Sequence, residues 1–142
     1  MKTKVWSKKN IGSGIIAGII AGVVLGFMMM RMGVFANIGA LIGMPNPLTG
    51  FIFHLIYSCI LGFIFAIVFV KVTKSFFSSA IWGVIYGIIW WFLGTLTFAQ
   101  LLMGMPVSWS CKAMMQGMQM LMGELVFGLV LGVCYHALRT RK

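Results

Sequence analysis

Four long, continuously apolar stretches constrain this chain more than any other feature of its sequence. They cover about residues 11–30, 51–70, 80–102 and 113–137, and each is near the roughly 20 residues that a helix needs to cross the hydrocarbon core of a membrane. Only 8% of the residues are charged, against about a quarter in soluble domains. The stretches also lack the alternation of transmembrane strands. The sequence therefore predicts an all-α, polytopic bundle of four transmembrane helices that forms a single membrane domain over residues 1–142.

The basic residues are concentrated on one side of this predicted bundle. They precede the first span, follow the second and end the chain, whereas only Arg31 and Lys112 fall on the other side. Because cytoplasmic loops carry the excess of lysine and arginine, we predict that the N and C termini are cytoplasmic. The same placement argues against a nucleic-acid partner despite the net charge of +10, and favours the lipid bilayer with its anionic headgroups.

Glu124 is the only acidic residue in the chain, and it lies inside the fourth span. Residues four apart lie on one side of a helix, so the fourth span carries a stripe of polar or small residues: Gln116, Met120, Glu124, Gly128, Gly132 and His136. The second span carries a similar stripe at the same spacing: Gly50, His54, Ser58, Gly62 and Ala66. Both stripes should face protein, because the remaining positions are apolar and suit lipid.

These two stripes align without gaps, which suggests an internal repeat. Residues 54–62 match residues 124–132, so that His54 corresponds to Glu124 and Gly62 to Gly132. In the odd spans, Gly83 and Gly87 are taken to correspond to Gly14 and Gly18. We predict two helix hairpins, residues 11–70 and 80–137, related as parallel repeats by a pseudo-twofold axis along the membrane normal.

Glu124 and His54 are the candidate functional residues, because they are ionisable groups at corresponding positions and at similar predicted depth. An ionisable residue inside a membrane is a candidate for function, and the two could meet in a proton or cation site that also includes Gln116, Ser58 and Met120. The alternative is that they are polar groups that hold two helices together through a hydrogen bond.

Glycine marks the predicted helix contacts. The first span contains Gly14, Gly18, Gly22 and Gly26 at intervals of four, and the even spans add Gly62, Gly128 and Gly132. Such stripes let two backbones approach closely. Packing within the monomer and self-association both use this contact, and the sequence does not choose between them.

Methionine is abundant, and apart from Met1 every methionine maps to the half of the membrane opposite the termini. Thioether sulfur suits Cu(I), and His54, Glu124 and Met120 would be available to such a metal. Flexible methionine equally fills gaps and forms adaptable apolar surfaces. His54 and His136 lie toward opposite ends of their spans, which disfavours a shared haem iron. The sequence therefore predicts no cofactor and no metal site with a defined set of ligands.

Three motifs resemble a group of small, uncharacterised four-span prokaryotic membrane proteins. They are the H-L-x-x-S segment that begins at His54, the Y-G-x-x-W-W-x-x-G segment of residues 86–94, and the G-M-P loop motif that begins at Gly104. The resemblance covers about residues 37–135. It implies a four-span fold in the cytoplasmic (inner) membrane of a prokaryote, with no established activity to carry over. In place of the histidine expected in the fourth helix of that group, this chain has Glu124.

Two hypotheses for the function follow. The first is a non-enzymatic integral membrane protein that acts through helix association, either with itself as a homo-oligomer or as a small subunit with other membrane subunits. The alternative is a small transporter or channel for cations, protons or copper with an intramembrane site at Glu124 and His54. No enzyme is predicted, because the sequence contains no Ser-His-Asp set, no paired acids and no phosphate-binding loop.

Overall fold

The computed structural model describes residues 6–141, and every regular segment in that range is helical. The long helices are α1 (Lys8–Arg31), α3 (Pro47–Phe69), α4 (Phe76–Trp90), which continues through the π-helix η1 (Trp91–Phe98) into α5 (Ala99–Leu102), and α6 (Cys111–Thr140). Lys8–Arg31, Pro47–Phe69, Phe76–Leu102 and Cys111–Thr140 are each long and apolar enough to cross a membrane. Each expected span coincides with one of them, which confirms the prediction of an all-helical chain with four candidate spans.

Each long helix begins at a residue whose side chain caps its first turn. The side-chain oxygens of Ser7, Asn46, Ser75 and Ser110 accept hydrogen bonds from backbone N–H groups that have no partner within the helix. Pro47 is the first residue of α3, where the missing N–H costs no helical hydrogen bond. The helix boundaries thus follow from local sequence.

The short helix α2 (Phe35–Ala40) folds back onto the start of α3. Phe35 is buried and packs edge to face against Phe51, with ring centroids 5.4 Å apart. The backbone of Phe35 also lies directly against Gly50, where a side chain would collide with it. The apolar loop after α1 therefore covers the first turns of α3 instead of extending away from the bundle.

Helices α1 and α3 form a hairpin in which backbone packs against backbone. A Cβ atom at Gly18 would lie 2.9 Å from the Gly62 Cα, and one at Gly62 would lie 2.8 Å from the Gly18 Cα. Gly14 contacts the Gly62 carbonyl, and Gly22 contacts the Ser58 side chain. The glycine stripe of α1 is therefore used inside the monomer, against α3.

Helices α4 and α6 form a second hairpin of the same kind. A Cβ atom at Gly83 would lie 3.0 Å from the Gly132 Cα and would also meet the Gly128 carbonyl. Gly87 packs against the backbone of Glu124, with a Cβ-to-carbonyl-carbon distance of 2.9 Å. The second contact helps to hold Glu124 in place, because α6 cannot shift there without a backbone clash.

The contacts of the two hairpins match in a register that differs from the predicted one. Gly62 lies against Gly14 and Gly18, whereas Gly132, which the sequence alignment pairs with Gly62, lies against Ser79 and Gly83. By these contacts Gly18 corresponds to Gly83, whereas the sequence alignment pairs Gly14 with Gly83. The two pairings differ by one helical turn. Glycines spaced four apart look the same after a shift of one turn, so sequence alone did not define this register.

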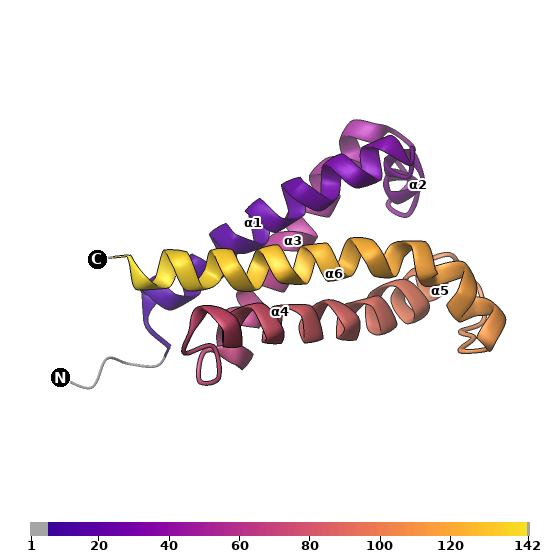
Figure 1. Cartoon of the computed structure of the whole chain (residues 1–142). Coiled ribbons are helices and arrows are strands. Elements are labelled where there is room, and N and C mark those ends of the chain that lie inside the picture. The colour runs from indigo at the N-terminus through magenta and orange to yellow at the C-terminus, as the bar shows by residue number, and fades with distance from the viewer. Residues whose placement is uncertain (1–5, 142) are drawn as a thin grey trace.

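The two hairpins meet at one end of the bundle and diverge at the other. We call the end where α1 begins and α6 ends the terminal end, and the end that carries residues 32–46 and 103–110 the loop end. Figure 1 shows α1 and α3 separating from α4 and α6 toward the loop end. At the terminal end, the space between the hairpins is filled by an aromatic cluster in which Phe65 packs against Tyr86 and Tyr135, at centroid distances of 5.2 and 5.5 Å.

The closest approach between the hairpins is made by α1 and α6. Ala17 and Ala21 of α1 are fully buried, and their small side chains let α1 lie near α6. Farther toward the loop end, Leu25 of α1 reaches Gly123 of α6, where an added Cβ would lie 2.8 Å from the leucine methyl carbon. Beyond this contact the hairpins diverge.

Arg139, in the last turns of α6, makes polar contacts at the terminal end. Its guanidinium donates hydrogen bonds to the carbonyl oxygens of Val70 and Thr73 and to the Thr73 hydroxyl, at 3.1 to 3.2 Å. These bonds tie α6 to the turn between α3 and α4. The terminal end is thus held together by polar contacts as well as by the aromatic cluster.

Candidate functional site

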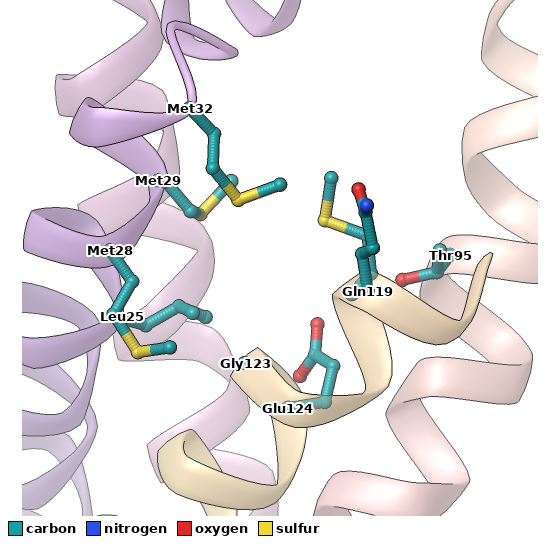
Figure 2. A pocket seen from close by; sticks show the side chains of 9 residues that line it. Leu25, Met28, Met29, Met32, Thr95, Gln119, Gly123 and Glu124 are labelled. Carbon is teal, nitrogen blue, oxygen red and sulfur yellow. The ribbon is translucent and has the colours of Figure 1, made fainter. Parts of the chain in front are cut away.

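Glu124 lines a small cavity where the hairpins begin to diverge. The cavity has a volume of about 100 Å³, which is space for an ion with a few water molecules. Its lining comes from α1 and the residue that follows it, from η1 and from α6: Leu25, Met28, Met29, Met32, Thr95, Gln119, Met120, Gly123 and Glu124. In Figure 2, the Glu124 carboxylate points into the space between the helices, with methionine side chains on the opposite wall. We refer to this cavity as the Glu124 pocket.

The π-helix η1 shapes the wall of the pocket beside α6. The Trp91 indole N–H donates a hydrogen bond of 2.8 Å to the Gly117 carbonyl, which fastens η1 to α6. Gly117 is buried, and an added Cβ would lie 2.9 Å from a methyl carbon of Leu96. Leu96 therefore packs against α6, and the preceding residue, Thr95, lines the pocket. Insertions of π-helix into α-helices are frequent at functional sites.

The Glu124 carboxylate has no counter-charge in the described structure. Within residues 6–141 it takes part in no hydrogen bond or salt bridge. Tyr57 of α3 lies near enough to interact with it electrostatically. A charged side chain in the middle of a span costs about 2.5–3.5 kcal/mol on insertion scales. A cation or a proton from outside the protein is therefore needed to neutralise the Glu124 carboxylate at this position.

His54 does not line this pocket. It is 7% exposed, and its Nε2 atom donates a hydrogen bond of 2.9 Å to the Gly22 carbonyl of α1. Its ring also packs near Phe35, at a centroid distance of 5.7 Å. His54 lies at the depth of Gly22 and Gly26 on the face of α1 that packs on α3, whereas the Glu124 pocket lies against another face of α1. The hypothesis that the two side chains meet is not supported, because no hydrogen bond or ion pair joins them within residues 6–141.

The other predicted site residues divide in the same way. Met120 lines the Glu124 pocket. Ser58 is buried against α1 and donates its hydroxyl hydrogen to the His54 carbonyl at 2.8 Å, so it acts in hairpin packing. Gln116 is exposed and lies outside the pocket. Of the predicted set, the structure therefore places only Met120 in the pocket with Glu124, and it brings Ser58 together with His54 outside the pocket.

Sequence reasoning missed the pocket residues that come from α1 and η1. Met28, Met29, Met32 and Thr95 lie opposite or beside Glu124. The cluster of methionines at the loop end of α1 could have indicated a shared site, because the predicted depth of these methionines in the membrane is similar to that of Met120. The sequence did not indicate that this face of α1 turns toward α6.

The described residues contain no group of three or more His, Cys, Asp or Glu side chains that could hold a metal ion. His136 lies in the terminal half of α6 beside Phe76, at a ring-centroid distance of 6.4 Å, while His54 packs against the loop half of α1. The two histidines therefore do not form a pair of ligands for one haem. Any metal in the Glu124 pocket would depend on sulfur and oxygen ligands.

The fold and the pocket define a multi-pass helical membrane protein with an ionisable residue between its hairpins. No protein-family model, curated protein or solved structure matches the chain. The resemblance to small four-span prokaryotic proteins therefore stays a prediction, and the function has to be argued from the pocket.

Proposed function

We propose that this protein is a small cation-binding carrier or channel of the membrane, with Glu124 as the group that attracts the cation. The observation that carries this proposal is that the only acidic side chain of the sequence lies in a pocket between the two hairpins and has no hydrogen-bond or ion-pair partner among residues 6–141. A structural carboxylate would be expected to accept hydrogen bonds from neighbouring helices. Glu124 instead projects into open space.

The pocket supports this proposal by its position. It lies at the point where α1 and α6 separate, so a change in the angle between the hairpins would widen or close it. The lining beside Glu124 includes Gln119 and Thr95, which supply further oxygen atoms. Carriers commonly place their site between two structural halves that can move against one another.

Helix association, with copies of itself or with other membrane subunits, stays a weaker prediction. The glycine stripe that suggested it packs on α3 inside the monomer. Any partner would have to bind exposed apolar side chains, such as Ile16, Ile20 and Phe27 of α1, which also suit lipid. We therefore favour the cation-binding function, and we treat the protein as non-enzymatic.

We also propose that the hairpins are parallel repeats and that both termini are cytoplasmic. The matched contacts of Gly62 and Gly132 support the first statement, and the charge bias supports the second. In a cysteine-free background, Lys74→Cys and Lys112→Cys should react with an impermeant maleimide from opposite sides of the membrane. Labelling of both from the same side would disprove the four-span topology.

Cation uptake into proteoliposomes tests the proposed function. The wild-type protein should take up at least one of sodium, potassium or silver ions, and Glu124→Gln, which keeps the shape of the side chain, should abolish uptake. His54→Gln is the matched control, because it replaces the corresponding ionisable residue outside the pocket. Uptake that survives Glu124→Gln, or its absence in the wild type, would contradict the proposal.

A further inference from the structure

Sulfur dominates the lining of the Glu124 pocket. Four of the nine lining residues are methionines: Met28 and Met29 from α1, Met32 directly after α1, and Met120 from α6. In Figure 2, the side chains of Met29, in α1, and Met32, just after it, extend toward the wall formed by α6. The two hairpins therefore contribute thioether groups to one space.

The donor set does not suit hard divalent ions. Calcium requires about six to eight oxygen ligands, and magnesium a nearly ideal octahedron of them. The side chains of the pocket provide oxygen only from Glu124, Gln119 and Thr95, and no histidine or cysteine lines it. Thioether sulfur is a soft ligand, and soft ligands select Cu(I).

The charge of the pocket selects a monovalent ion. Glu124 is the only acidic residue in the chain, so it can neutralise one positive charge and no more. A divalent ion would keep an unbalanced charge inside the membrane, which is costly in a medium of low dielectric constant. A monovalent soft metal ion satisfies both the charge and the ligand chemistry.

We propose that the pocket binds a soft monovalent metal ion of the Cu(I) class, held by Met29, Met32 and Met120 and neutralised by Glu124. This inference rests on the proposed cation-binding function and names the class of its ligand. Because the sulfur ligands come from both α1 and α6, a bound ion would bridge the hairpins. Gap-filling by methionine does not account for this arrangement, because the pocket retains about 100 Å³ of empty space beside them.

Silver ion is the probe that tests the site, because it has the charge and softness of Cu(I) and does not change its oxidation state. Thiols bind silver tightly, so the full-length protein is first made cysteine-free by Cys59→Ala, Cys111→Ala and Cys134→Ala, none of which touches the pocket. Equilibrium dialysis with metal analysis should then give one silver ion per chain. Met29→Leu, Met32→Leu and Met120→Leu together should weaken binding at least tenfold.

The matched control replaces three exposed methionines outside the pocket, Met103→Leu, Met105→Leu and Met115→Leu. This triple variant should bind silver as tightly as the cysteine-free parent. Equal binding by the pocket and control variants would overturn the inference. X-ray absorption on the silver-loaded parent should show sulfur neighbours, and a shell of oxygen or nitrogen alone would also overturn it, whether or not the pocket variant folds.

The outcomes separate the metal inference from the proposed function. Sodium or potassium uptake that depends on Glu124, without stoichiometric silver binding, would refute the soft-metal site and leave the cation function standing. Silver binding through the pocket methionines, with no uptake of any cation, would support the site and refute the carrier or channel. Failure of both measurements would refute both.

Discussion

Replacement of Gly18 by alanine should loosen the first hairpin. The new Cβ would lie 2.9 Å from the Gly62 Cα and would also meet the Ser58 carbonyl, whereas ordinary contacts begin at 3.4 Å. Both obstacles are backbone atoms, and the Ser58 carbonyl oxygen is the nearer one, so the helices have to separate by roughly 0.5–1 Å. A gap of that size forfeits about a quarter to a half of the attraction between each pair of packed atoms.

Gly12 of the same helix provides the matched control, because a Cβ there would meet nothing within 4 Å. Both replacements gain about 1 kcal/mol of helix propensity, which cancels in the comparison. Overpacking of a close contact costs about 1–3 kcal/mol. We therefore expect the free energy of unfolding of Gly18→Ala to be lower than that of Gly12→Ala by about 1–3 kcal/mol.

Unfolding by SDS in mixed micelles, followed by tryptophan fluorescence and circular dichroism, measures this difference. Equal stability of the two variants would refute the close packing of α1 on α3. The difference should also be independent of protein concentration, because the contact lies within one chain. A loss of stability that grows on dilution would show instead that the glycine stripe serves self-association.

Three further predictions concern contacts outside the pocket. Arg139→Ala removes the charged donor of two hydrogen bonds to Thr73. It should lower the free energy of unfolding, measured in the same SDS titration, by ~1.5–3 kcal/mol for each of these bonds. Trp91→Phe removes the indole donor to the Gly117 carbonyl and should cost about 1 kcal/mol, and an unchanged titration midpoint would argue against the η1–α6 contact. In micelles, a polar maleimide should label Cys111, which is exposed, and spare the two half-buried cysteines of the spans until SDS unfolds them; equal labelling rates would contradict the packing of the spans.

The sequence by itself determined the helical content, the four spans and the role of glycine. Each span is a long apolar run, and a chain in hydrocarbon can satisfy its backbone polar groups only by forming helices or closed barrels. Gly18 and Gly62 were recognisable as packing residues because small residues at intervals of four form a groove on any helix. Glu124 was recognisable as a candidate because it is the only acidic residue of the sequence.

The tertiary structure decided which residues share a site. His54 and Glu124 are aligned with one another in the predicted repeat, yet His54 faces α1 within its own hairpin and Glu124 faces the space between the hairpins. Helical periodicity defines the faces of each helix, but the choice of facing partner depends on side-chain volumes across the bundle. Ala21 lets α1 approach α6, whereas Tyr86 and its aromatic neighbours fill the space between α3 and α4. That difference in volume places the methionines of α1 opposite Glu124.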